Sequence, residues 1–143
     1  MKTAQWIISL VSLISLTSHA QGNVLNVKAS EVAGSAGLVG SIETTVVDEK
    51  KEILTDVQGL SVYTFDLDKA NTSNCKGGCL KEWPPVHVPT GEQVQQPFGV
   101  IQGNDGQPQL TLKGLPLYHY DDDKNPGDAF GEYPKWHVIT VLP

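Results

Sequence analysis

The residues of this sequence best suited to metal chemistry are two histidines and one aspartate in its C-terminal third. His119 and Asp123 lie in one short stretch, and His137 follows Trp136 further along the chain. Imidazole nitrogens combined with a carboxylate suit a transition metal, whereas Ca²⁺ takes oxygen ligands. The pattern predicts His119, Asp123 and His137 as candidate metal ligands. The alternative is that they are hydrogen-bonded polar groups at strand ends, which is the more common role of an isolated histidine.

Cys75 and Cys79 are the only two cysteines, and Lys76-Gly77-Gly78 separates them. In an exported protein, two cysteines this close predict a disulfide that closes a short loop. The alternative is a redox pair, although the C-x-x-C of thioredoxin-like proteins and the C-x-x-C-H of covalent haem attachment are both missing. Two sulfurs alone do not complete a metal site.

Acidic and amide side chains form two clusters that offer oxygen ligands. The clusters are Asp66, Asp68, Asn71 and Asn74, then Asp121, Asp122, Asp123, Asn125 and Asp128. Such loops can bind Ca²⁺, but their spacing differs from that of an EF-hand. We favour the interpretation that these residues end strands and bond to their own backbone in turns.

Sequence motifs of common enzyme classes are missing. There is no G-x-S-x-G, no H-E-x-x-H and no phosphate-binding G-x-x-x-x-G-K-[ST] in the chain. A non-catalytic role is therefore the favoured interpretation, with an enzyme as the weaker alternative.

The charge balance excludes some classes of partner. The chain has 143 residues, which suits a single domain, and its 10 cationic residues are all Lys against 16 acids, for a net charge of −6. A nucleic-acid binder needs a basic face, so this composition argues against one, and it disfavours anionic membranes as well.

The first 20 residues have the pattern of a cleavable signal peptide. Lys2 precedes an apolar run, and Ser18-His19-Ala20 ends the segment with small residues where a signal peptidase cuts. The run is shorter than the roughly 20 apolar residues of a membrane span. The sequence thus predicts a signal at 1–20, a flexible lead-in at 21–40 with one short strand, and a β-rich domain at 41–143. We expect a soluble periplasmic or secreted protein without a membrane span.

An internal repeat is the strongest structural signal. Residues 59–68 align with 114–123, and each copy has a short apolar run, a glycine, alternating residues and an acidic stop. This pattern predicts two β-hairpins with Gly59 and Gly114 at the turns, where a positive φ is free of the Cβ penalty. We also expect strands at 42–47 and 53–55 and a single helical turn at 80–83, which two prolines end.

These features define the predicted fold class. It is mainly β: a single small domain of two pseudo-symmetric antiparallel hairpin units with long Pro/Gly-rich loops. Trp83 and Trp136 follow the two hairpins at similar distances, so both are predicted to be buried where the units pack together. The aromatic residues have two possible roles, cross-strand packing or the lining of a groove for a flat cofactor or sugar.

Both repeats carry the motif Y-x-(F/W/Y)-x-x-D. Its residues are Tyr63, Phe65 and Asp68 in the first copy and Tyr118, Tyr120 and Asp123 in the second. Together with the cysteine and tryptophan elements, the motif resembles the secreted-repeat family of predicted bacterial lipoproteins that is named for it. The resemblance implies a β-rich extracytoplasmic protein of unassigned role. The chain lacks the lipobox Cys, so surface anchoring is not implied.

Three functions are left open by the sequence. The favoured one is a non-catalytic binding or accessory module outside the cytoplasm, with a metal ion, a cofactor or another protein as its ligand. The first alternative is a redox protein that holds haem or copper through His119 or His137, or exchanges thiols through Cys75 and Cys79. The second alternative is a structural envelope protein.

Overall fold

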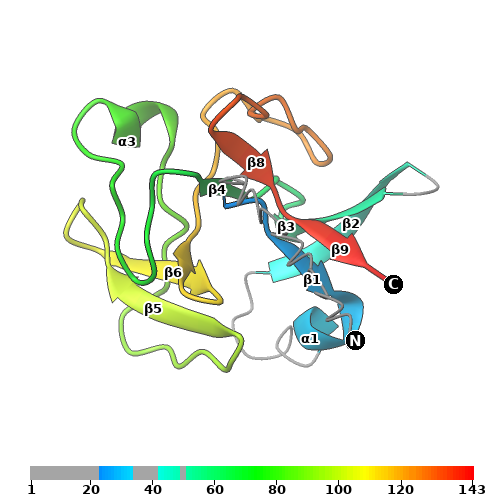
Figure 1. Ribbon diagram of the computed structural model, residues 1–143, viewed down its shortest axis with the longest axis horizontal. Helices are drawn as coiled ribbons and strands as arrows, with labels where there is room; N and C mark the ends of the chain where they lie inside the picture. The colour runs from blue at the N-terminus through cyan, green and yellow to red at the C-terminus, as the bar shows by residue number, and fades with distance from the viewer. Residues whose placement is uncertain (1–22, 34–41, 49–50) are drawn as a thin grey trace, which may run out of the picture.

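Two repeats of similar strands interleave in the computed structural model, which describes residues 23–33, 42–48 and 51–143 (Figure 1). The predicted signal peptide lies outside these residues. The first repeat contributes β2 (Ile42–Asp48), β3 (Lys51–Asp56), β4 (Tyr63–Phe65) and the helix α3 (Cys79–Glu82). The second contributes β5 (Phe98–Gln102), β6 (Pro108–Leu112), β7 (Leu115–Pro116), β8 (Trp136–Val138) and β9 (Thr140–Leu142). The mainly β class that the sequence predicts is confirmed.

The strands form three small sheets. Their orders are β1-β9-β3-β2, β4-β8 and β5-β6-β7, where β1 is Asn26–Lys28. All named pairs are antiparallel except β1 with β9, which is parallel.

Both predicted hairpins are present. The turn glycines Gly59 and Gly114 have φ of +83° and +81°, in the region that favours glycine. In the first repeat the Val62 N–H donates to the Leu54 carbonyl at 3.3 Å, and in the second the Leu117 N–H donates to Leu110 at 3.0 Å. Leu54 therefore matches Leu110 and Val62 matches Leu117, with one extra residue in the first turn.

A pseudo-twofold axis passes between the motif tyrosines. The Tyr63 N–H donates to the Tyr118 carbonyl at 2.8 Å, and the Tyr118 N–H returns a bond to Tyr63 at 3.0 Å. The last strand of the second repeat, β9, pairs with β3 of the first. In the matching way, the last segment of the first repeat pairs with β6 of the second, through a bridge between His87 and Gln109. Each repeat thus completes a sheet of the other.

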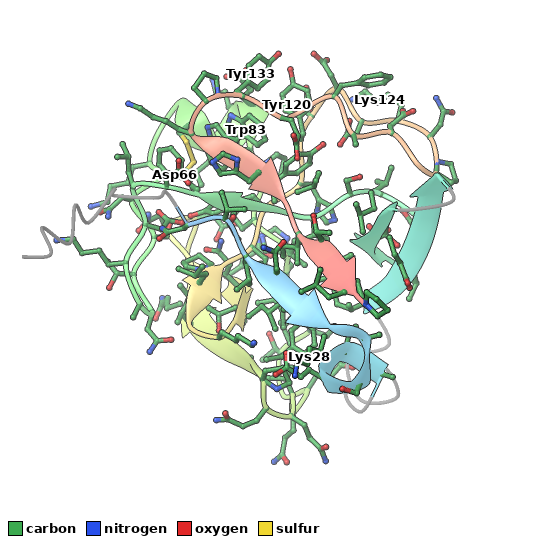
Figure 2. The ribbon with its side chains drawn as sticks, turned by 45° about the vertical axis from the view of Figure 1, so that its right-hand side comes forward. Lys28, Asp66, Trp83, Tyr120, Lys124 and Tyr133 are labelled. Atoms are coloured by element: carbon green, nitrogen blue, oxygen red, sulfur yellow. A yellow bond between two sulfur atoms is a disulfide. The ribbon has the colours of Figure 1, made fainter. Side chains whose placement is uncertain are left out.

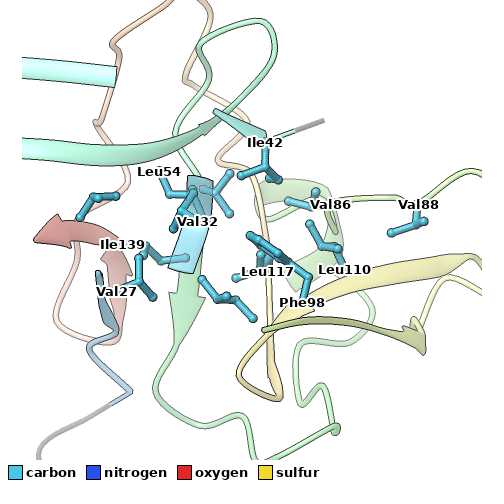
Figure 3. Close-up of a cluster of buried hydrophobic side chains, with 13 residues drawn as sticks. Val27, Val32, Ile42, Leu54, Val86, Val88, Phe98, Leu110, Leu117 and Ile139 are labelled. Atoms are coloured by element: carbon cyan, nitrogen blue, oxygen red, sulfur yellow. The ribbon is translucent and has the colours of Figure 1, made fainter. Parts of the chain in front are cut away.

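The buried side chains form two separate clusters. Val62 and Leu117 lie in a cluster that is aliphatic except for Phe98 (Figure 3), here called the aliphatic cluster. The next residues, Tyr63 and Tyr118, lie in a second cluster that is rich in aromatic rings, here called the aromatic cluster. Neighbouring residues of a strand face opposite sides, so the motif strands separate the two clusters and are covered on both faces.

The segment before the first repeat is more regular than the predicted lead-in. Residues 26–28 form β1, and α1 (Ala29–Ala33) is a helix that the sequence prediction did not contain. Val27 and Val32 are buried in the aliphatic cluster, so residues 23–33 pack on the domain. Residues 34–41 lie outside the described part. The helical turn predicted at 80–83 is present as α3, with Pro84 and Pro85 shortly after it.

None of the helices in the described segments is long and apolar enough to cross a membrane.

Candidate functional site

Four aromatic rings stack in a row through the centre of the aromatic cluster. The ring centroids of Trp83 and Trp136 are 3.8 Å apart with an interplanar angle of 3°. Phe65 stacks on Trp136 at 4.2 Å, and Tyr120 lies on Trp83 at 4.6 Å. The third motif position of each repeat therefore packs on the tryptophan of the other repeat, and both tryptophans are buried as predicted. Figure 2 shows Trp83 close to Tyr120 and Tyr133 at one end of the molecule.

The first and last motif positions are also exchanged between repeats. Tyr63 donates its hydroxyl hydrogen bond to Asp123 at 2.6 Å, and Tyr118 donates to Asp68 at 2.7 Å. Burial raises the pKa of Tyr63 and Tyr118 above the usual value, and the bonded carboxylates act in the same direction. Burial also raises the pKa of Asp68. These groups hold the repeats together, and all four side chains are buried.

The three predicted metal ligands have separate partners in the structure. His119 Nε2 lies 3.1 Å from Asp56 Oδ2, and His137 Nε2 lies 3.0 Å from Asp66 Oδ2. Asp123 is the acceptor of Tyr63. Among the described residues, no three His, Cys, Asp or Glu side chains are grouped where they could hold one metal ion. The structure does not bring His119, Asp123 and His137 together, and metal binding by them stays a prediction.

The acidic clusters make local turn bonds. Asp68 Oδ1 accepts the Asn74 N–H at 2.6 Å, and Asp128 Oδ2 accepts the N–H groups of Lys124 and Asn125 at 2.9 and 2.8 Å. These contacts are the ones expected of carboxylates that end strands and shape turns.

The predicted disulfide between Cys75 and Cys79 is confirmed. Cys75 is buried in the aromatic cluster, and Cys79 is the first residue of α3. The bond therefore ties the helical turn that precedes Trp83 to the loop that follows Asp68.

A pocket of about 350 Å³ opens beside His119. Its walls come from both repeats: the hairpin turn of the first repeat, the segment after Trp83, and the motif strand of the second repeat. The lining residues are Asp56, Val57, Gln58, Pro84, Pro85, Val86, His87 and His119. This volume lies at the small end of the range of about 300–1,000 Å³ for ligand pockets.

The polar groups of this pocket are held in fixed positions. Asp56 Oδ1 accepts the backbone N–H groups of Gln58 and Leu60 at 2.9 and 3.0 Å, which leaves Oδ2 directed at His119. Burial lowers the pKa of His119, although the Asp56 carboxylate opposes this shift. His119 Nε2 is fully buried and makes no well-aligned hydrogen bond, while a quarter (25%) of the His119 side chain is exposed.

Sequence reasoning found His119 but missed Asp56. Asp56 precedes Gly59 in the first hairpin and is not among the predicted site residues. A signal did exist, since the matched position in the second hairpin is the apolar Leu112. A charged residue where the twin repeat has leucine marks a local difference in chemistry.

The fold and these contacts define a mainly β protein built from two interleaved repeats. Residues 44–87 and 99–140 each match the family model described as a secreted repeat of unknown function. Because the two matches cover more than half of the chain, the protein belongs to this family, as the motif resemblance indicated. No curated protein and no solved structure matches the chain significantly.

Proposed function

We propose that the protein is a non-catalytic binding module that acts outside the cytoplasm and holds its ligand in the pocket beside His119. The observation that carries this proposal is the Asp56–His119 pair at a pocket of about 350 Å³. The location is supported by the description of the family as secreted, and by the predicted signal at 1–20.

The chemistry of the pocket favours a cationic ligand that donates hydrogen bonds. Asp56 supplies a carboxylate oxygen, and burial of His119 favours its neutral form. The net charge of −6 attracts cations toward the whole molecule. A buried polar atom without a well-aligned partner, such as His119 Nε2, is costly until a bonding group completes its contacts. A guanidinium or ammonium group that enters the pocket would bond to Asp56 and allow the His119 ring to realign.

Nuclear magnetic resonance of the exported protein tests this proposal, with N-acetyl-arginine amide as the cationic probe and N-acetyl-glutamate amide as the anionic control. We expect the arginine compound to shift the Gln58 amide and His119 ring signals saturably, and the glutamate compound to leave them unchanged. Asp56→Asn should weaken binding at least fivefold. Asp121→Asn removes the same charge from an exposed site and should not weaken it.

The proposal fails if neither compound moves these signals. It also fails if Asp121→Asn weakens arginine binding as much as Asp56→Asn does, because the attraction would then depend on net charge and not on the pocket.

A further inference from the structure

The pseudo-twofold axis relates the open pocket to a surface that the chain's own N-terminal segment covers. His119 and Thr64 are the second residues of the two motifs, and Gln58 and Lys113 each precede a turn glycine. The Leu54 N–H donates to the Ile139 carbonyl, and at the matching position the Leu110 N–H donates to the Val86 carbonyl. Ile139 therefore matches Val86, and the residues that directly follow these two match as well. His87 is thus the counterpart of Thr140.

The chain's own N-terminal segment occupies the twin place on the second repeat. Thr64 Oγ1 donates to the Asn23 carbonyl at 2.7 Å. Asn26 in β1 pairs with Thr140 in β9, so that β1 runs alongside β9 (Figure 1). Lys113 lies 2.9 Å from Glu31. The extended residues 23–28 therefore touch the counterparts of His119 and His87, and the helix α1 that follows them touches the counterpart of Gln58. All three counterparts correspond to residues that line the open pocket.

The backbone at His87 is oriented for a further strand. Val86 donates its N–H to Leu117 at 2.9 Å and accepts from Leu110 at 2.8 Å, and the Val88 N–H donates to Pro108 at 3.0 Å. The peptide groups of Val86 and Val88 thus face β6 and Leu117, and alternation turns the N–H and C=O of His87 to the opposite side. No backbone partner in the described segments takes these two groups. At the matching position, Thr140, the neighbouring strand is β1.

A row of backbone carbonyl groups after the first motif strand has a counterpart after the second motif strand. The Asn23 side-chain amide donates to the carbonyls of Phe65, Asp66 and Asp68 at 3.0, 3.3 and 2.8 Å. The matching carbonyls beside the open pocket belong to Tyr120, Asp121 and Asp123. A side chain rich in hydrogen-bond donors suits such a row, and the nearby Asp56 carboxylate favours a donor that is positively charged.

We propose that the pocket binds an extended segment of another protein, which adds as a parallel strand at His87 and carries an arginine or lysine at the Asp56–His119 end. This inference rests on the proposed binding function and names its ligand class. Strand addition takes its affinity from main-chain hydrogen bonds and its specificity from side-chain pockets beside the strand. Here the open edge at His87 supplies the main-chain hydrogen bonds, and the pocket with Asp56 supplies the side-chain specificity.

The test uses the hexapeptide acetyl-Arg-Val-Leu-Asn-Val-Lys-amide, added to isotope-labelled exported protein. It has the sequence of residues 23–28 with arginine in place of Asn23, because Asn23 contacts Thr64, the counterpart of His119. We expect saturable shifts of the His87 and Gln58 amides with little change at Thr140. His87→Pro removes the outward N–H at a sheet edge and should weaken binding at least tenfold. His87→Ala keeps that N–H and is the matched control, which should bind within about threefold of the parent. A fully N-methylated version of the peptide should not bind.

The inference is overturned if the hexapeptide does not bind, or if His87→Pro and N-methylation leave its binding unchanged. If the arginine compound still binds in that case, the pocket function stands and only the strand inference is lost. A concentration-dependent dimer of the protein that His87→Pro dissociates would also overturn the assignment, because the occupant would then be a second copy of this chain.

Discussion

The hydroxyl of Tyr63 and the carboxylate of Asp123 meet at 2.6 Å although they belong to different repeats. Asp123 also accepts the Phe130 N–H at 2.9 Å, and Tyr63 accepts the Gly131 N–H at 3.0 Å. The motif spacing therefore positions each aspartate for the tyrosine of the other repeat, and not for its own. The motif thus joins the two interleaved repeats through hydrogen bonds between them.

A double-mutant cycle tests this exchange. We expect Tyr63→Phe to cost about 1–3 kcal/mol, because it leaves the buried Gly131 N–H and the Asp123 carboxylate each with one partner fewer. Combined with Asp123→Ala, the coupling energy from urea denaturation should exceed about 0.5 kcal/mol, as for residues in contact. The matched cycle of Tyr63→Phe with Asp68→Ala should give a coupling near zero. Equal coupling in both cycles would contradict the exchange.

The stacked tryptophans should dominate the stability of the aromatic cluster. Trp83 and Trp136 are only 4% and 7% exposed, so replacing either with Ala should cost about 3–5 kcal/mol. Phe130 is the control, because it is 66% exposed and Phe130→Ala should change the free energy of unfolding by less than about 0.5 kcal/mol. Denaturant unfolding followed by tryptophan fluorescence and circular dichroism measures both. A near-neutral Trp83→Ala variant would show that the stack contributes little.

Much of this architecture is predictable because its causes are local. The turn glycines Gly59 and Gly114 need a positive φ that other residues avoid, and this need marks both hairpins in the sequence. The bond between Cys75 and Cys79 follows from their short separation. The helix α1 is missed because a five-residue helix shows no helical period in a sequence.

The contacts that make the site are not local, and the sequence does not reveal them. The pairing of His119 with Asp56 depends on how the two repeats are placed about the pseudo-twofold axis. The equivalent places of the two Trp-bearing loops instead suggested a cluster of His119 with Asp123 and His137. In the structure Asp123 faces the interior and bonds to Tyr63, whereas His137 pairs with Asp66. The identity of each residue was visible in the sequence, but the side of the sheet and the partner were not.

Gly131 is a close-approach position that should not tolerate a side chain. A Cβ atom there would lie 2.8 Å from ring carbons of both Tyr120 and Tyr63, and 2.9 Å from Trp83. Gly131→Ala should therefore destabilise the protein by about 1–3 kcal/mol through overpacking, measured by urea denaturation. Gly78→Ala is the control, because a Cβ atom there meets nothing within 4 Å and its φ is −59°. Equal stability of the two variants would show that the cluster can expand around residue 131.

His119 should make the protein less stable as the pH falls. Burial lowers the pKa of His119 below its ordinary value of 6.5, so at mildly acidic pH the unfolded chain binds a proton that the folded protein does not. A falling pH favours the state that binds more protons, which here is the unfolded state. The free energy of unfolding should therefore decrease progressively below about pH 6.5. His119→Gln removes this group and should reduce the loss of melting temperature between about pH 7 and about pH 5. Gln58→Ala is the control, because Gln58 lines the same pocket and does not titrate, and it should keep the parent's pH dependence. If His119→Gln keeps the full acid sensitivity of the parent, the burial of His119 is not its source.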